Sequence, residues 1–429
     1  MTTLLLFLLF VGLLVVGVPV AFSLSIAGTL GMLLTLGIEK TLVTLPNVMY
    51  GGLNSFTLIA IPLYVLMGNI MIKGRLSDEI YNVLNRFIGQ FHGGMSIVTV
   101  CFCTIFAAIS GSSVATAATV GMLVLPEMLR AGYQRKFIFG LTAAGGTLGI
   151  LIPPSLNFIL YGALTDESVG RLFIAGIIPG LLLASMFMIY SILFSWKAGY
   201  KSDLVYTWPE RFRAARQAFW SLLIIPIIMV GIYMGVFTAT EAAGVGAVYA
   251  LIVSLVKRRL SVRDMIDVLL ETVKTSCMVL LIVVGAMIFG YVVTVLQLPQ
   301  TIINAMVEHQ VTAWQFLLGS FFLILFLGCF VECVTIMVLM VPILYPVVLH
   351  LGIDPIWFAV FLTVNMELAL ITPPVGLNLF VINTIVPDSK LGEVYWGVWP
   401  FLAIMCFFLI LLCFFPSMAT WLPTMMMGK

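Results

Sequence analysis

The sequence predicts an all-α polytopic membrane protein, and three features predict it: the composition, long apolar runs and two double prolines. Of the 429 residues, 62% are hydrophobic and 9% are charged, and the mean hydropathy is +1.19. A water-soluble domain of this length could not cover so much apolar surface. This apolar composition makes membrane lipid an expected partner. The formal net charge is only +2 and no basic domain is present, so nucleic acid is not an expected partner.

Apolar runs give most of the predicted topology. We predict membrane-crossing helices near residues 4–20, 22–38, 53–72, 172–195, 218–236, 240–256, 275–296 and 395–415. Charged amphipathic segments at 75–90 and 261–274 are predicted to lie along the inner interface. Two longer apolar stretches, 94–130 and 312–349, each contain an interruption, and each is predicted to form a re-entrant helical hairpin.

The double prolines predict a broken helix within residues 135–164 and another within 356–386. They are Pro153-Pro154 and Pro373-Pro374. Because proline lacks a backbone N–H, the carbonyl four residues earlier loses its partner. The carbonyls expected to be free belong to Gly149, Ile150, Ala369 and Leu370. Free carbonyls at membrane depth are tolerated only where they face protein or a wet cavity, so both breaks are predicted to line one.

The two halves of the sequence match when one is laid over the other. Pro126 then falls on Pro346, Gly132 falls on Gly352, and the double prolines coincide. The distribution of Lys and Arg among the loops places the two copies in opposite orientations. An inverted repeat is a recurrent plan of alternating-access carriers, so we predict an elevator-type transporter. The predicted domains are N-terminal scaffold spans in 1–52, a first repeat in 53–196, scaffold spans in 197–260 and a second repeat in 261–429.

Several motifs carry a resemblance to a known family. They are Ile61–Gly68, Ser110–Thr116, Ile152–Ser155, Tyr161-Gly162, Gly235–Ala243 and Thr372–Asn378. With these motifs in this order, the chain resembles the large membrane subunit of TRAP (tripartite ATP-independent periplasmic) transporters, which belong to the ion-transporter superfamily. The resemblance implies a multi-pass protein of the bacterial inner membrane, a smaller four-span membrane subunit, here expected as a separate chain, and a periplasmic substrate-binding protein. It also implies Na⁺-driven import of an organic acid anion such as a C4-dicarboxylate or a sialic acid.

The first hairpin tip, Ser110-Gly111-Ser112-Ser113, is a candidate half of a sodium site. Glycine permits the turn, and hydroxyl and carbonyl oxygens are the ligands that hard cations prefer. We predict that this tip and the first break enclose one Na⁺; the alternative is a capped helix–turn–helix that binds no ion. The predicted ligands are Ser110, Ser112, Ser113, Gly149, Ile150, Ile152 and Pro154.

The second tip carries Glu332, a carboxylate within a long apolar stretch. A charge at that depth is costly unless it is paired, which favours a functional role. We predict a second Na⁺ site there, although Glu332 could instead cap the following half-helix, and Glu367 is a rival ligand, supporting residue or proton site. The predicted ligands are Cys329, Glu332, Ala369, Leu370, Thr372 and Val375.

The predicted mid-membrane segments contain no Lys or Arg that could hold an anionic substrate. Helix N-termini at the tips and after the breaks, hydroxyl groups and bound Na⁺ are therefore expected to hold it. The amides of Asn157 and Asn378, one after each double proline, could contact substrate or cap a half-helix. The predicted substrate-binding residues are Ser113, Ser155, Asn157, Thr335 and Asn378.

Other function classes fit the sequence less well. No phosphate-binding loop, catalytic triad or metal-ligand cluster is visible, so we expect neither an enzyme nor any cofactor besides the coupling ion Na⁺. A stand-alone Na⁺/dicarboxylate or citrate symporter is the main alternative, and it would need no binding protein. An ion channel is a third possibility, which predicts single-channel currents without saturable uptake.

Overall fold

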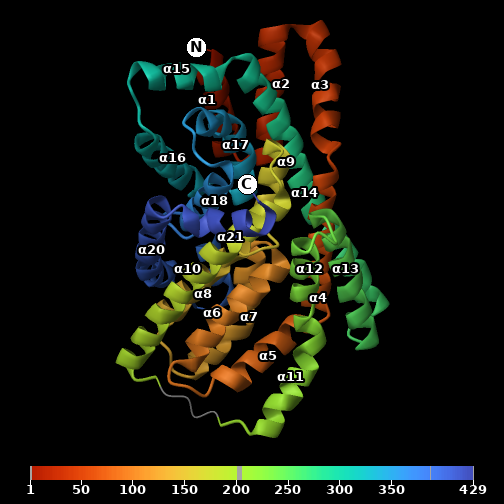
Figure 1. Cartoon of the computed structure of the whole chain (residues 1–429), viewed down its shortest axis with the longest axis vertical. Coiled ribbons are helices and arrows are strands. Elements are labelled where there is room, and N and C mark those ends of the chain that lie inside the picture. The colour runs from red at the N-terminus through yellow and green to blue at the C-terminus, as the bar shows by residue number, and fades with distance from the viewer. Residues whose placement is uncertain (1, 201–204, 387, 429) are drawn as a thin grey trace.

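The computed structural model describes residues 2–200, 205–386 and 388–428, and over these ranges the chain is helical without β-strands (Figure 1). The elements of its first part are α1 (Thr2–Val15), α2 (Val20–Leu36), α3 (Ile38–Leu53), η1 (Phe56–Ile59), α4 (Ala60–Lys73), α5 (Leu76–Ile88), α6 (Gly94–Ser110), α7 (Ser113–Arg130), α8 (Arg135–Thr147), η2 (Leu148–Ile150), α9 (Leu156–Thr165) and α10 (Val169–Ala198). Helices α1 to α3 lie toward one end of the molecule and α5 toward the other.

In the first part, a helical pair (α6–α7) is followed by an interrupted helix (α8–α9) and a long helix (α10), and the later elements repeat this order. They are α11 (Trp208–Leu222), α12 (Ile224–Tyr233), α13 (Ala239–Val256), α14 (Val262–Val295), α15 (Leu298–Glu308), α16 (Ala313–Gly328), α17 (Cys333–His350), α18 (Pro355–Leu370), α19 (Leu377–Ile385), α20 (Leu391–Phe414) and α21 (Ser417–Met427). Both double prolines lie in the interruptions, and both contain a cis peptide bond.

Six helices of the described chain are long and apolar enough to cross a membrane, and the bent pair α11–α12 could add a seventh. The membrane-protein class predicted from composition therefore agrees with the structure. Helices α3, α15 and α21 were not predicted. Each has a mixed sequence or falls below the length of a span, so hydropathy gives it little signal.

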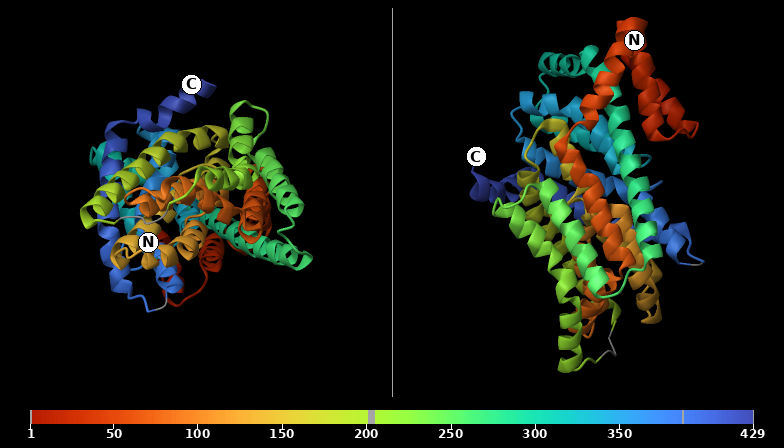
Figure 2. Two further views of the ribbon diagram at one scale, coloured as in Figure 1. Left: turned by 90° about the horizontal axis from the view of Figure 1, so that it is seen from below. Right: turned by 90° about the vertical axis from the view of Figure 1, so that its right-hand side faces the viewer.

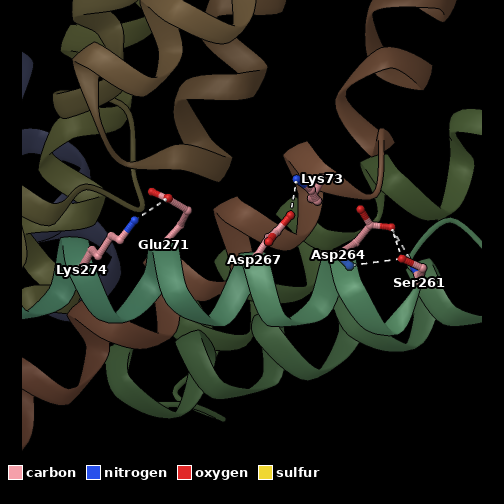
Figure 3. A network of polar contacts seen from close by, with 6 residues as sticks. All are labelled: Lys73, Ser261, Asp264, Asp267, Glu271 and Lys274. Carbon is pink, nitrogen blue, oxygen red and sulfur yellow. Dashed lines mark hydrogen bonds and ion pairs between the residues drawn. The ribbon is translucent and has the colours of Figure 1, made fainter.

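The segment at 261–274, predicted to lie along the inner interface, does not end before the predicted span that follows it. Those residues continue into the apolar part to form α14, a single helix of 34 residues. Ser261 caps its N-terminus, and the Ser261 hydroxyl and Asp264 carboxylate are 2.6 Å apart. Figure 3 shows the charged turns that follow, in which Lys73 at the end of α4 contacts Asp267 at 3.0 Å. No proline or glycine interrupts α14 before Gly285, so nothing bends the helix where it becomes apolar.

Tight helix crossings hold the interior together. Helix α14 packs along α2, and a Cβ at Gly28 would lie 2.7 Å from the Phe289 nitrogen. Helix α8 crosses α20 where Gly140 meets Gly397 backbone to backbone. Small residues at such crossings allow close backbone approach, which drives helix association in membranes.

The two halves also contact each other through the helices that follow the tips and the breaks. Helix α7 packs against α19, and α17 packs against α9. Helix α17 additionally packs against α14, while α6 packs against α4. These contacts bring both tips and both breaks to the centre of the molecule, against the packed pair α4 and α14 (Figure 1; the right-hand view of Figure 2 shows the long course of α14).

Candidate functional site

A cavity of about 330 Å³ lies where the two tips and the two breaks meet. Helices α4 and α14 supply its remaining wall through Val65, Gly68, Asn69, Ile72, Thr275, Met278 and Val279. The predicted site residues that line it are Ser110, Ser112, Ser113, Ile150, Asn157, Glu332 and Leu370. The predicted site residues that lie outside its lining are Gly149, Ile152, Pro154, Ser155, Cys329, Thr335, Ala369, Thr372, Val375 and Asn378.

The first tip is a two-residue turn between α6 and α7. Gly111 ends α6 in the left-handed conformation with φ of 59°, which glycine adopts without strain. Ser112 then caps α7, and its hydroxyl accepts a hydrogen bond from the Ala115 N–H at 3.4 Å. A capped turn is therefore present, and it leaves further oxygen atoms on the inner side of the tip.

Those oxygen atoms form a buried cluster around Thr116, a residue that we had not predicted. The Thr116 hydroxyl lies 2.7 Å from the Ser110 hydroxyl and donates to the Ser112 carbonyl at 2.8 Å. Gly149 of the first interruption faces this cluster, since a Cβ there would lie 2.6 Å from the Ser112 carbonyl oxygen. Thr116 follows Ser112 by four residues, so helical spacing alone could have identified it.

The first break lies directly on the first tip. The Leu156 N–H donates to the Gly111 carbonyl at 3.4 Å, and the Pro154 carbonyl oxygen would lie 3.1 Å from a Cβ on Gly111. The expectation that the Ile150 carbonyl lacks a donor is wrong, because the Ser155 hydroxyl donates to it at 2.5 Å. Serine after a double proline can replace the missing backbone donor with its side chain.

The second tip is less regular. Glu332 occupies the N-cap position of α17, but its side chain makes no capping hydrogen bond, so the carboxylate remains half-buried in the cavity wall. Gly328 at the end of α16 touches Ala369, and the Cys329 sulfur lies 4.0 Å from the Pro373 carbonyl. The second tip therefore packs against the second break, as the first tip does against the first.

The second break also retains more hydrogen bonds than expected. The expectation of a free Ala369 carbonyl is wrong, because the chain tightens after α18 and the Thr372 N–H donates to it at 3.2 Å. The Thr372 hydroxyl donates to the Leu368 carbonyl at 2.6 Å. Further along, the Tyr395 hydroxyl donates to the Pro374 carbonyl. A carbonyl oxygen has two lone pairs, so Ala369 keeps one acceptor position.

Glu367 is the most deeply buried acid of the described chain. It is 0% exposed on α18, and neither carboxylate oxygen has a hydrogen-bond partner among the described residues. Glu367 and Glu332 both lie near Cys333, the first residue of α17. An unpaired buried acid is expensive, which makes Glu367 a candidate functional residue.

The two asparagines after the double prolines have different surroundings. Asn378 is 0% exposed, and its amide donates to the Ser113 hydroxyl at 2.7 Å and to the Ala143 carbonyl at 3.3 Å. Asn157 lines the cavity beside Cys333, and apart from the Cys333 sulfur, a weak acceptor, its Nδ2 has no partner among the described residues. Thr335 is buried on α17, and its hydroxyl is likewise unpaired in the described part of the chain.

The wall formed by α4 and α14 was not foreseen. Its polar members are Asn69, whose amide donates to the Thr272 hydroxyl at 3.0 Å, and Thr275. Both helices look like ordinary spans in the sequence, because single polar residues hardly change the mean hydropathy. Over the described residues no group of His, Cys, Asp and Glu has metal-binding geometry.

The fold is shared with solved membrane proteins that are transporters. The YdaH transporter of Alcanivorax borkumensis has a similar structure, with a TM-score of 0.61 at 14% identity over 89% of both chains. The Neisseria gonorrhoeae efflux pump MtrF aligns with a TM-score of 0.57 at 12% identity, over 91% of this chain and 85% of that one.

Sequence comparison gives the family. The family model "Tripartite ATP-independent periplasmic transporter, DctM component" matches residues 7–418. The C4-dicarboxylate TRAP transporter large permease protein DctM of Pseudomonas aeruginosa is 41% identical over 82% of this chain and 83% of that protein. The sialic acid TRAP transporter large permease protein SiaM of Vibrio cholerae is 36% identical over 97% of both. The chain belongs to the DctM family of TRAP transporter large permease subunits.

Proposed function

We propose that this chain is the permease of a Na⁺-coupled, binding-protein-dependent importer of organic acid anions. The observation that carries the proposal is the convergence of two helix-pair tips and two helix breaks on one cavity. Interrupted helices that meet at the centre of a transporter supply carbonyl oxygens for cations and helix N-termini for anions. The partners are a small four-span membrane subunit and a periplasmic binding protein, and the location is the bacterial inner membrane.

The first Na⁺ is proposed to bind between the first tip and the first break. The Ser110 hydroxyl, the Ser112 carbonyl and the Thr116 hydroxyl already lie within hydrogen-bonding distance of one another. Gly149 faces them without a side chain, so its backbone can approach the ion. Oxygen-only ligands suit a hard monovalent cation.

The second Na⁺ is proposed to bind between the second tip and the second break. Glu332 supplies a carboxylate in the cavity wall, and Leu370 reaches the same wall from the end of α18. Cys329, Ala369, Thr372 and Val375 remain proposed contributors through backbone or side-chain atoms. Their positions behind the lining make them suitable for an ion that is covered when the tip closes.

The anion is proposed to bind between these ions, against helix N-termini. The cavity lining contains no Lys, Arg or His in the described chain. Helices α7, α9, α17 and α19 begin at the tips or after the breaks, and their first N–H groups and dipoles favour a carboxylate. The relatives named for C4-dicarboxylate and sialic acid transport indicate the substrate class.

Sodium coupling gives the transport step its driving force. Moving one negative charge inward against about 100 mV costs roughly 2.3 kcal/mol. Two co-transported Na⁺ ions offset or reverse this cost and add their own concentration gradient.

Movement is proposed to follow an elevator mechanism built on an inverted repeat. The helix pairs α6–α7 and α16–α17 are the proposed re-entrant hairpins, and they would move together with the two broken helices. Cross-contacts between α7 and α19 and between α9 and α17 support one mobile unit drawn from both halves. Helices α4 and α14 belong to the proposed scaffold.

Uptake into proteoliposomes tests the proposal. Both membrane subunits are reconstituted, loaded binding protein is added outside, and radiolabelled substrate is followed with and without external Na⁺. We expect accumulation that requires both Na⁺ and the binding protein. Uptake that persists without external Na⁺ would refute the coupling, and uptake that persists without the binding protein would favour a stand-alone symporter.

A further inference from the structure

The two asparagines that follow the double prolines occupy equivalent positions. Asn157 is the second residue of α9, Asn378 is the second residue of α19, and a leucine precedes each. Each faces the first residue of the helix that follows the tip in the other half. Asn378 meets Ser113 at the start of α7, and Asn157 lies beside Cys333 at the start of α17.

One atom makes these two contacts chemically different. Ser113 offers a hydroxyl oxygen, and the Asn378 amide uses it at 2.7 Å, with the Ala143 carbonyl as a second acceptor. Cys333 offers a sulfur, which is a weak acceptor. Apart from this weak sulfur acceptor, the Nδ2 of Asn157 has no hydrogen-bond partner among the described residues, although Asn157 is only 1% exposed.

An unpaired buried amide is costly unless a ligand satisfies it. Asn157 lines the cavity, whereas Asn378 does not. At the first tip the Ser110 hydroxyl contacts the Thr116 hydroxyl, the Ser112 hydroxyl accepts from the Ala115 N–H, and the Ser113 hydroxyl accepts from Asn378. The Asn69 amide donates to Thr272. An amide N–H₂ group donates only, so what it binds must offer an oxygen acceptor.

We propose that Asn157 is a specificity-determining residue whose Nδ2 donates to a carboxylate or hydroxyl oxygen of the substrate, while Asn378 is a positioning residue that holds Ser113. This inference rests on the proposed transport function and assigns separate tasks to two residues that the sequence presents as alike. The sulfur at position 333 keeps the Asn157 donor available. The oxygen at position 113 occupies the equivalent donor of Asn378.

Cys333 provides a test that needs no binding protein. In a variant that keeps Cys333 as its single cysteine, methyl methanethiosulfonate should modify the thiol from the cavity. At saturating Na⁺, succinate (a C4-dicarboxylate) or N-acetylneuraminate (a sialic acid) should slow the modification. A matched protein with the exposed Cys277 as its single cysteine should show no protection.

In the Cys333 background, Asn157→Leu removes the donor at similar volume. We expect the concentration of succinate or N-acetylneuraminate that protects Cys333 to rise about tenfold or more. Thr165→Val on the same helix removes only a local hydroxyl bond and should leave protection unchanged. Asn378→Leu should lower the melting temperature of the purified protein and raise the protecting concentration less than Asn157→Leu does, because its amide acts only through Ser113 and does not reach the cavity.

A second variant keeps the proposal falsifiable if Asn157→Leu does not fold. Cys333→Ser gives Asn157 a hydroxyl acceptor like the one that Ser113 gives Asn378, so the Asn157 donor is no longer available to the substrate. This substitution should reduce the maximal uptake rate while the half-saturating Na⁺ concentration stays constant. Unchanged protection in Asn157→Leu, unchanged uptake in Cys333→Ser, or failure of both probes to protect wild-type Cys333 would overturn the inference. Loss of Na⁺ dependence with protection intact would instead overturn the proposed coupling.

Discussion

At the scale of single residues, the first tip depends on a threonine that holds its oxygen atoms together. Thr116 is fully buried and joins the Ser110 hydroxyl to the Ser112 carbonyl. Thr116→Val keeps the shape and removes the oxygen. We expect the half-saturating Na⁺ concentration for uptake to rise about tenfold, the cost of about one hydrogen bond or ligand.

Thr104→Val is the matched control for this change. Thr104 lies on α6, and its hydroxyl bonds only to the Val100 carbonyl within its own helix. Its Na⁺ dependence should match that of the wild type. Equal Na⁺ dependence in both variants would show that the first tip is a capped turn without an ion.

A substitution at Glu332 tests whether this residue belongs to a second ion site or only caps α17. Its side chain makes no capping bond, so Glu332→Gln should leave α17 intact and remove only the charge. We expect the Hill coefficient for Na⁺ in uptake to fall from about two toward one. Glu308→Gln, an exposed acid at the end of α15, is the control. An unchanged coefficient would remove Glu332 from the ion site.

At the scale of helices, close crossings fix how the broken helices are held. Gly140 on α8 meets Gly397 on α20 without room for a side chain. Gly140→Val should force the helices apart and lower the free energy of unfolding by about 1–3 kcal/mol, measured as a loss of thermal stability in detergent. Gly319→Val on α16 is the control, since a Cβ there has nothing within 4 Å.

Helix α5 is anchored by one acid. Glu79 accepts from the Ser221 hydroxyl at 2.7 Å and pairs with Lys257 at 2.5 Å and Arg259 at 3.6 Å, with its side chain only 10% exposed. Glu79→Gln should lower stability by about 1–3 kcal/mol. Glu271→Gln breaks only the exposed pair with Lys274 and should cost less than about 0.5 kcal/mol. Equal losses on thermal unfolding would contradict the anchor.

At the scale of the whole molecule, the elevator proposal requires α17 to move past α14. A Cβ on Gly290 would lie 3.8 Å from the Pro342 Cβ, close to the average of about 3.8 Å in disulfides. In a background without native cysteines, Gly290→Cys with Pro342→Cys should stop uptake when oxidised and recover on reduction.

A crosslink within the scaffold is the control for this prediction. A Cβ on Gly74 would lie 3.4 Å from the Ser254 Cβ, and both residues belong to proposed scaffold segments. Oxidised Gly74→Cys with Ser254→Cys should leave uptake intact. Full activity of the crosslinked Gly290–Pro342 pair would mean that α17 does not slide against α14.

Much of the fold could be predicted from the sequence, because the strongest signals are local. Proline has no N–H to donate, so Pro153-Pro154 and Pro373-Pro374 predict breaks wherever they occur in a helix. Gly111 between serines predicts a turn. The charged residues at 261–274 do not mark the end of a helix, since charge alone does not end a helix that has no Pro or Gly to interrupt it.

The site was only partly predictable, because the sequence signals are local and the site is built by distant segments. Ser110, Ser112, Asn157 and Glu332 stood out because polar groups are rare in apolar runs. The donors to the Ile150 and Ala369 carbonyls, and the wall from α4 and α14, depend on where other segments pack, which periodicity does not reveal.

The sequence by itself determined the membrane class, the family, the two breaks and the two tips, because hydropathy, proline chemistry and motif order act within short stretches. Only the tertiary structure decided that tips and breaks share one cavity, and that Asn378 is bound by Ser113 while Asn157 beside Cys333 is not. The physical reason is that a hydrogen bond between segments more than 200 residues apart depends on packing, and identical residues then acquire different partners.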